Sequence, residues 1–210
     1  QFLIINICCI SIKIKEIKLI IKLCMYGGRI VSVKNSFGIK NAELDVLLDV
    51  SHFSQTDIDR LHKLQPLIEP RLPELTENFY QQLQGNPITA VYLEGRIDGL
   101  KATHIQWMKG LFSVHFTEEY IQSLWNIGRI HARLEIPPLF VSASMSFLRS
   151  EFPKFITPED AKSIGCTQVD LIASVLKILD INHFVIDGSY YDGLLEFTGI
   201  SKKLLHKLMS

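Results

Sequence analysis

IGRIHARLEIPPLF, residues 127–140, is the stretch of this sequence that decides its fold. Ile127, His131 and Leu134 follow one another at spacings of i, i+4 and i+7, which places them on one face of an α-helix. The Pro-Pro pair that follows ends this helix and separates it from the next one. The pattern therefore predicts a helix with an apolar face and a histidine in the middle of that face.

An imidazole on an apolar helix face needs partners for its ring nitrogens, because a polar group buried without one is destabilising. Two solutions are open for His131. The ring can coordinate a metal such as haem iron, for which neutral imidazole is a good ligand. Alternatively, it is a core histidine that is hydrogen-bonded to a carbonyl group. The helix pattern alone favours the carbonyl-bonded histidine, so the decision depends on the rest of the sequence.

Helical periodicity repeats through the chain from Ser51 to about Tyr191. Capping residues and prolines give the boundaries: Ser54 precedes the first helix, Pro66 is expected to end it, and Pro158 begins the last one. No convincing strand signal interrupts this pattern, so the sequence predicts an all-α fold. The helices are expected at about 54–66, 70–85, 96–112, 117–133, 140–152 and 158–191.

The composition is that of one globular domain, with 47% apolar and 21% charged residues among 210. Lysine plus arginine equals aspartate plus glutamate at 22 each, so the formal net charge is zero and we expect no nucleic-acid partner. The four cysteines form neither a disulfide framework nor a zinc-ligand spacing, which is typical of a reducing compartment, and we expect a cytoplasmic protein. They are Cys8, Cys9, Cys24 and Cys166.

Residues 1–50 are expected to be an N-terminal extension outside the core. Its first part, 1–24, is rich in isoleucine, lysine and leucine and precedes Met25, the first methionine. No uncharged run in it reaches the roughly 20 residues of a membrane span, and its lysines follow the apolar run, unlike those of a signal peptide. We interpret 1–24 as a fragment boundary or an over-extended reading frame, with a membrane-surface anchor as the alternative.

Standard catalytic motifs are missing from the sequence. It contains no GxGxxG, no Walker loop, no HExxH and no GxSxG, and no paired carboxylates stand out. We therefore expect no catalytic residues and no enzyme activity in this chain. Among its seven histidines, His131 is the most informative because of its place on a predicted apolar face.

Three motifs of this sequence resemble those of globin-coupled sensors and protoglobins, which bind haem. Residues 127–140 are similar to the family's proximal pattern, I-G-x-x-H-x-R-I-G-L-P-P-x-W-Y. ENFYQQL at 77–83 resembles its F-Y-x-x-L motif, and IDGLKAT at 97–103 with LFS at 111–113 resembles its distal helix. The motifs occur in the family's order, and the resemblance covers about residues 56–191. It implies the sensor variant of the globin fold.

The resemblance also implies a cofactor and its ligands. Haem b would be bound through its iron by His131 as the proximal ligand. Tyr80 would donate a hydrogen bond to the bound gas, with Leu100 and Thr103 on the distal side. A hydroxyl group suits this role, although Thr103 could equally bond a carbonyl of its own helix, and Tyr80 could be a core ring with its hydroxyl at the surface. The expected pocket also includes Phe79, Ile127 and Phe140.

Three residues depart from the family pattern. Glu135 replaces a glycine, Phe140 a tryptophan and Val141 a tyrosine. The last replacement removes a hydroxyl group on the side of the proximal histidine. The way in which that side tunes the haem iron, or the transmission of the signal, is therefore expected to differ in this chain.

Other residues near the predicted pocket leave alternatives open. His104 follows Thr103 directly and is a candidate for coordinating the iron when no gas is bound. Packing or surface roles are expected for His115, Trp107 and Trp125.

An oxygen-sensing haem protein is the function that the resemblance favours, with carbon monoxide or nitric oxide as other ligands. In the family, the last two helices form a homodimer interface and lead to an output module. We expect the globin domain at 51–195, and at 196–210 a tail or the start of a linker to an output domain or partner. The alternatives are a protoglobin-like protein that binds or consumes O2 or NO, and a haem-free globin-like signalling module, against which His131 argues.

Overall fold

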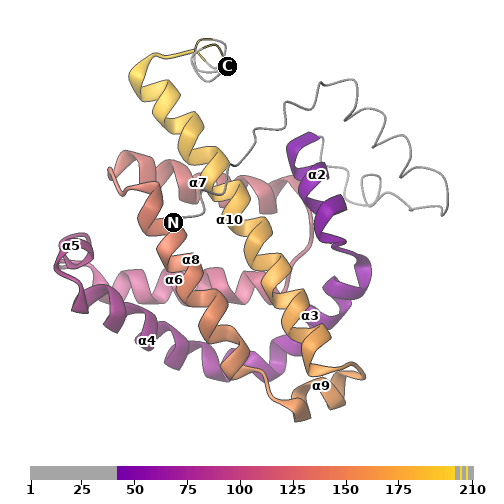
Figure 1. Ribbon diagram of the computed structural model, residues 1–210. Coiled ribbons are helices and arrows are strands. Elements are labelled where there is room, and N and C mark those ends of the chain that lie inside the picture. Colours follow the sequence, from indigo (N-terminus) through magenta and orange to yellow (C-terminus); the bar gives the residue numbers. More distant parts are fainter. Residues whose placement is uncertain (1–41, 202–203, 205–206, 208–210) are drawn as a thin grey trace, which may run out of the picture. The chain divides into compact units, whose positions relative to one another are not determined.

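The computed structural model describes residues 42–201, 204 and 207, and within them it contains helices and no strand (Figure 1). This confirms the all-α prediction. Residues 1–41, including the segment 1–24 interpreted above, lie outside the described residues. None of the described helices is long and apolar enough to cross a membrane. The α-helices are α2 (Ala42–Ser51), α3 (Gln55–Ile68), α4 (Leu72–Gly85), α5 (Pro87–Ala90), α6 (Ile97–Phe112), α7 (Glu118–Arg133), α8 (Pro138–Glu151), α9 (Pro158–Ile164) and α10 (Gln168–Thr198), and the 3-10 helices are η2 (Glu69–Arg71) and η3 (Phe152–Phe155).

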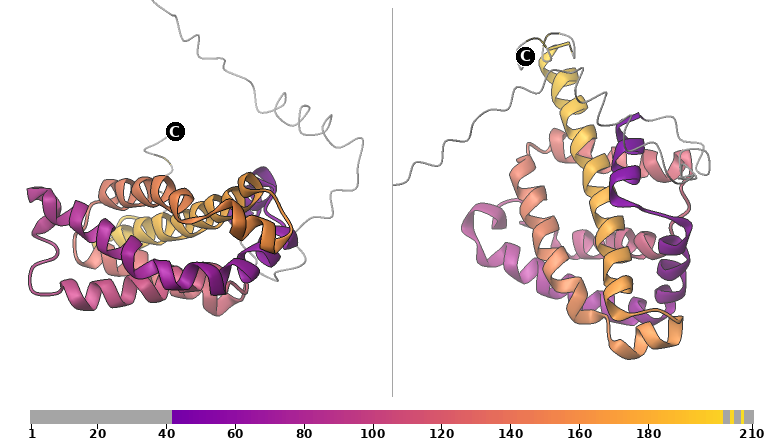
Figure 2. Two further views of the ribbon diagram at one scale, coloured as in Figure 1. Left: turned by 90° about the horizontal axis from the view of Figure 1, so that it is seen from below. Right: turned by 45° about the vertical axis from the view of Figure 1, so that its right-hand side comes forward.

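The long helix α10 is the element around which the others are arranged. It packs most extensively against α7 and also contacts α2, α3, α8 and α9. On the other side, α6 lies against α3 and α4. The left view of Figure 2 shows α4 and α6 opposite α8 and α10. This arrangement leaves α4, α6, α7 and α8 as the walls of the space in which the predicted site residues lie.

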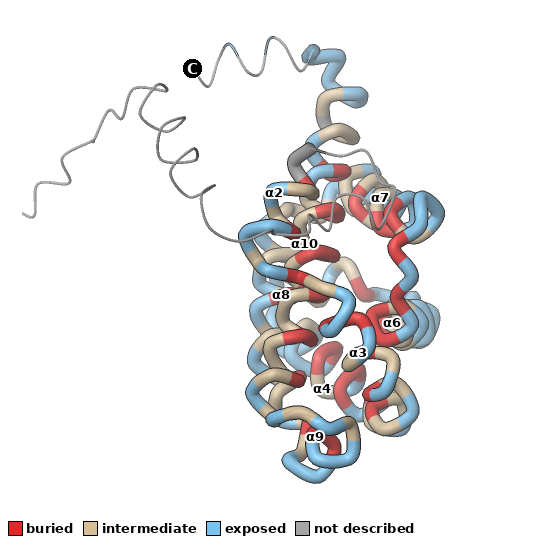
Figure 3. The backbone as a smooth tube through the Cα atoms, turned by 90° about the vertical axis from the view of Figure 1, so that its right-hand side faces the viewer, coloured by how far each residue is buried: buried red, intermediate tan, exposed pale blue. Residues whose placement is uncertain are grey.

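One core cluster takes buried apolar side chains from all the long helices, and Figure 3 shows the buried residues on the inner faces. The core also reaches into residues 42–50, which the sequence analysis assigned to the extension. Leu44 and Leu48 lie one turn apart on α2 and are 1% and 4% exposed, so both belong to the core. Other fully buried large side chains are Phe53, Leu61, Leu64, Ile68, Leu72, Met108, Phe112, Leu124 and Phe152.

Two helix boundaries differ from the predicted ones. Helix α3 continues through Pro66 to Ile68, because a proline in the last turn removes only a hydrogen bond close to the helix end. The predicted last helix is two helices. Gly165 has a left-handed φ of 86° and ends α9, and the Thr167 hydroxyl, which accepts a hydrogen bond from the Asp170 N–H, begins α10.

Helices α7 and α10 come closest at Gly128. A Cβ atom at this position would overlap the carbonyl oxygen of Ile186 and the hydroxyl of Ser189, both on α10. Further along α7, the methyl group of Ala132 would lie 3.1 Å from a Cβ built on Gly193. The two helix backbones can therefore pack at this separation only because residue 128 has no side chain.

Substitution of Gly128 tests this contact. We expect Gly128→Ala to lower the free energy of unfolding by about 1–3 kcal/mol or more, because the added methyl group forces α7 away from α10. Chemical denaturation followed by circular dichroism measures the change. Gly110→Ala on α6 is the matched control: beyond the neighbouring backbone of its own helix, no described atom lies within 4 Å of its added methyl group, so it should raise stability by up to about 1 kcal/mol. Equal effects of the two substitutions would contradict the close approach.

Candidate functional site

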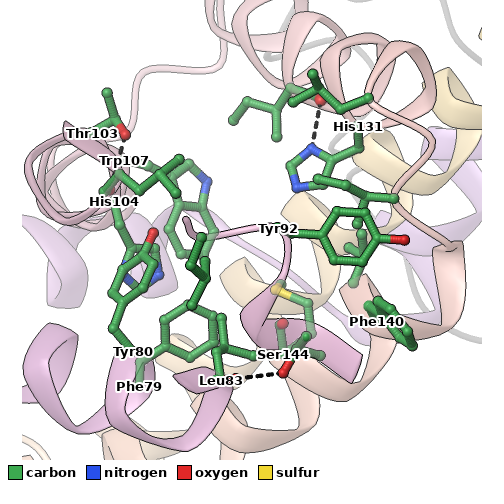
Figure 4. Close-up of a pocket in the computed structure, with 18 of the residues that line it drawn as sticks. Phe79, Tyr80, Leu83, Tyr92, Thr103, His104, Trp107, His131, Phe140 and Ser144 are labelled. Atoms are coloured by element: carbon green, nitrogen blue, oxygen red, sulfur yellow. Dashed lines mark hydrogen bonds between the residues drawn. The ribbon is translucent and has the colours of Figure 1, made fainter. Parts of the chain in front are cut away.

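A cavity of about 310 Å³ lies between α4, α6, α7 and α8 (Figure 4). This volume is at the lower end of the roughly 300–1,000 Å³ found for small-molecule sites. Most of the wall is apolar, as such sites require. All seven residues that the sequence predicted for a haem pocket line it, and they are Phe79, Tyr80, Leu100, Thr103, Ile127, His131 and Phe140.

His131 lies in the last turn of α7 with its ring on the cavity wall (Figure 4). Its Nδ1 is 2.8 Å from the carbonyl oxygen of Ile127, one turn back in the same helix. Because a carbonyl only accepts, Nδ1 carries the proton in this hydrogen bond, and Nε2 is the ring nitrogen that can coordinate a metal. Nε2 has no hydrogen-bond partner among the described residues. A backbone carbonyl that orients the ring through one nitrogen is typical of metal-binding histidines.

The turn after His131 is a Schellman motif that fixes the end of α7. The N–H of Ile136 donates to the His131 carbonyl at 3.0 Å, and the N–H of Glu135 donates to the Ala132 carbonyl at 3.1 Å. The motif requires a left-handed residue, and Glu135 has a φ of 54°. The resemblance placed a glycine here, and the structure gives the reason, since glycine adopts this conformation without a steric penalty. The turn brings Ile136 to the cavity wall.

His104 lies on the α6 side of the cavity in a three-ring stack. Its ring centroid is 4.6 Å from that of Phe79 and 5.4 Å from that of Trp107, with interplanar angles of 25° and 17°. Nδ1 of His104 is buried and has no hydrogen-bond partner in the described part of the chain. Burial lowers the pKa of His104 to about 4, so the ring is neutral at pH 7.

Tyr80 and Thr103, the two predicted hydroxyl donors, have different environments. Tyr80 is 6% exposed, and its ring meets that of His104 edge-on at 5.7 Å. Burial raises the pKa of Tyr80 to about 12, so its hydroxyl stays protonated, and no described residue accepts its proton. The Thr103 hydroxyl instead donates to the carbonyls of Gly99 and Leu100 in its own helix, at 3.0 and 2.9 Å. Tyr80 is therefore the better placed donor.

A buried asparagine connects the cavity wall to two other helices. The indole N–H of Trp107 donates to Oδ1 of Asn182 on α10 at 3.1 Å. Nδ2 of Asn182 donates to the Tyr120 hydroxyl on α7 and to the Ile178 carbonyl, each at 2.8 Å. Asn182 is fully buried, so these bonds replace those that it would make with water. Trp107 is held in place on the cavity wall by this network.

The sequence analysis missed part of the cavity wall. Trp107, expected to be a packing or surface residue, lines the cavity, and so do Tyr92 and Arg96 from the segment before α6. Arg96 is exposed and donates through Nη2 to the Tyr92 carbonyl at 2.7 Å. Its position at the start of a predicted helix gave no sign of this role. A guanidinium at the edge of an apolar cavity suits a carboxylate such as those carried by haem.

The described residues fit a haem group. One wall offers a histidine oriented through Nδ1, the opposite wall holds a half-buried histidine whose Nδ1 has no partner among the described residues, and mainly apolar side chains line the cavity between them. Neutral imidazole is the ligand that binds haem iron in globins. His131 would hold the iron, and Arg96 would face the carboxylates.

Comparison with known proteins identifies this helical domain and its histidine-bearing cavity as a globin fold. The sequence model of the Protoglobin family matches residues 40–186, so this chain belongs to the protoglobin family. The globin domain of the Geobacter sulfurreducens globin-coupled sensor is similar, with 30% sequence identity and a TM-score of 0.61 over 69% of this chain and 95% of that one.

A second solved structure, the ferric globin domain of E. coli DosC, shares the fold. It has 17% sequence identity and a TM-score of 0.56, covering 70% of this chain and 98% of that one. No curated protein matches the chain.

The Glu135 turn provides a test of the local backbone. We expect Glu135→Gly to raise the free energy of unfolding by about 1 kcal/mol, because glycine removes the left-handed strain that follows His131. Glu135→Ala is the control, since it removes the carboxylate but keeps the Cβ atom, and it should give no such gain. Urea denaturation of the three proteins measures the differences. If both variants gain stability equally, the gain comes from removal of the carboxylate and not from relief of the backbone strain.

Proposed function

We propose that this chain is a haem-based gas sensor that binds O2, with CO or NO as other ligands, at a haem b iron held by His131. The observation that carries the proposal is the bond from Nδ1 of His131 to the Ile127 carbonyl, which leaves Nε2 facing the cavity. Haem, when bound, supplies an iron that can take a diatomic gas as ligand. The similarity to the globin domain of a globin-coupled sensor supports the sensor role.

Tyr80 is the proposed hydrogen-bond donor to the gas. The Tyr80 side chain is 6% exposed and its hydroxyl is protonated and without a partner among the described residues, whereas the Thr103 hydroxyl is engaged by its own helix. A bound O2 gains partial negative charge, and a donor in a dry cavity stabilises that charge more strongly than water does. Leu100 and Phe79 keep this side of the cavity apolar.

The signal is proposed to leave through α8 and α10, with a second copy of the chain as the partner. Both helices contribute to the cavity wall, and both expose large apolar side chains outside it. Leu139 on α8 is 73% exposed, and Phe197 near the end of α10 is 87% exposed. Figure 1 shows the end of α10 projecting beyond the other helices, as a connection to an output domain would require.

The iron ligand is tested first. In the full-length chain, produced with a haem supply, we expect a Soret band that shifts on reduction and on addition of O2. His131→Ala should bind haem at least about tenfold more weakly, and added imidazole should restore the spectrum. His115→Ala, at an exposed position outside the cavity, is the matched control. A folded wild-type protein that stays colourless with added haem would favour the haem-free signalling module.

The distal donor is tested by O2 release. We expect Tyr80→Phe to speed O2 dissociation about tenfold, the effect of losing a hydrogen bond worth about 1.4 kcal/mol. Stopped-flow displacement of O2 by CO measures the rate. Thr103→Val, which removes a hydroxyl already bonded to α6 carbonyls, should leave the rate unchanged. The opposite pattern would assign the donor role to Thr103.

A further inference from the structure

We propose that Arg149, His183 and Asp187 form a pH-dependent link between α8 and α10, which is closed near neutral pH and opens when His183 takes up a proton in mildly acidic solution. The three residues lie outside the cavity wall described above. The inference goes beyond the proposed function, because it gives these two helices an input other than a gas. Only its consequence for signalling rests on that function.

The link joins two helices that lie side by side (Figure 1). Nη2 of Arg149 on α8 is 3.0 Å from Nδ1 of His183 on α10. Oδ2 of Asp187, one turn further along α10, is 3.1 Å from Nε2 of His183, and Oγ of Ser142 on α8 is 3.4 Å from the same nitrogen. Arg149 is itself held by Asp180 on α10, with 2.7 Å between Nε and Oδ1.

These contacts define the protonation state of the His183 ring. A guanidinium group only donates, so Nδ1 of His183 accepts a hydrogen bond from Arg149 and carries no proton. The ring proton is then on Nε2, which donates to the Asp187 carboxylate. The neutral form of His183 therefore connects a cation on α8 to an anion on α10.

A second proton on the His183 ring breaks this connection. It binds at Nδ1, the nitrogen that keeps its lone pair, and Nδ1 then directs an N–H toward the donor Nη2 of Arg149. Two donors cannot form a hydrogen bond, and two positive charges at this distance repel each other. The Arg149 side chain is 30% exposed, so it has room to turn away toward solvent. The hydrogen bond between α8 and α10 is thereby lost.

The surroundings of His183 set the pH range of this change. Burial is the largest influence and lowers the pKa of His183 below its ordinary value of about 6.5; Asp187 opposes this shift, Arg149 adds to it, and Asp180 opposes it. In the described part of the chain, the other elements packed against α10 contribute no charged group that acts on the ring. Because the pKa is lowered, the link is intact at pH 7 and is lost as the pH falls below about 6.5.

The link stands behind two walls of the cavity. Helix α8 contributes Met145 and Leu148 to the cavity wall, and α10 contributes Ile186, the residue next to Asp187. Loss of the link therefore loosens the contact between these walls. It also acts on the two helices through which the signal is proposed to leave, so acid shifts the balance between helix packings independently of a gas.

Titration of His183 tests the link directly. Side-chain ¹H–¹⁵N NMR of the full-length chain, as its ferrous CO complex or as isolated if it takes up no haem, gives the tautomer and the midpoint. We expect an Nε2–H tautomer that titrates below pH 6.5. Arg149→Met should move the midpoint to higher pH, and Asp187→Asn should move it to lower pH. Arg129→Met, which removes an arginine paired with Glu196 between α7 and α10, is the matched control and should not move it.

Amide hydrogen exchange, corrected for the intrinsic rate at each pH, measures the opening. From about pH 7.5 to about pH 5, on either side of the ordinary histidine pKa, α8 of the wild type should lose protection about tenfold, the effect of losing one hydrogen bond to a charged group. His183→Gln, which cannot titrate, should show no such loss. Helix α3 packs against α10 without this link and is the internal reference.

Three results would overturn the link. One is a His183 ring that carries its proton on Nδ1 or titrates above pH 6.5, and another is a midpoint that Arg149→Met leaves in place. The third is an equal loss of α8 protection in His183→Gln, which would assign the proton to Asp187, whose pKa is raised by burial. A chain that takes up no haem overturns the proposed function alone, because neither measurement depends on haem.

Discussion

The contact between the backbones of α7 and α10 at Gly128 is the constraint on which the site depends. Gly128 lies against Ile186 and Ser189, and Ile186 is also part of the cavity wall. His131 follows three residues later on α7, so the depth at which its ring enters the cavity is set where the two backbones meet. Two backbones in contact cannot relieve a clash by changing a side-chain rotamer. The position of His131 is therefore determined by how α7 packs against α10.

Some polar groups of the cavity wall have hydrogen-bond partners within the protein, and others have none among the described residues. Thr103 is satisfied by its own helix and His131 is satisfied at one nitrogen, whereas the Tyr80 hydroxyl and the His104 ring have no partner among the described residues. Unsatisfied buried groups are destabilising, and natural proteins tolerate them mainly at functional sites. Three such atoms occur among the described residues, and one of them, Nδ1 of His104, belongs to a residue of the cavity wall, whereas the Thr76 hydroxyl and Oδ1 of Asp187 do not.

Sequence periodicity predicted the long helices α3, α4, α6, α7 and α8, because each buries one apolar face and the spacing of that face is local information; α2 and the short α5 were not predicted. The three motifs that resemble the family, at 77–83, 97–103 and 127–140, together predicted seven residues that line one cavity. The bond from Trp107 to Asn182 could not be predicted, because it joins residues 75 positions apart in the chain. The three-ring stack of His104 could not be predicted either, because it depends on how α4 packs against α6. The break at Gly165 was missed for a different reason: apolar spacing continues on both sides of it, and only the left-handed φ reveals the turn.

The hydrogen bonds of the cavity wall differ in how far they reach into the protein. Nδ1 of His131 bonds to the Ile127 carbonyl of its own helix, so this hydrogen bond does not tie the histidine to α8 or α10. The bond from Trp107 to Asn182 does join the cavity wall to α10, and it starts beside His104. Asn182 on α10 is therefore hydrogen-bonded both to the α6 wall of the cavity, through Trp107, and to α7, through Tyr120, while the part of α7 that carries His131 meets α10 at Gly128.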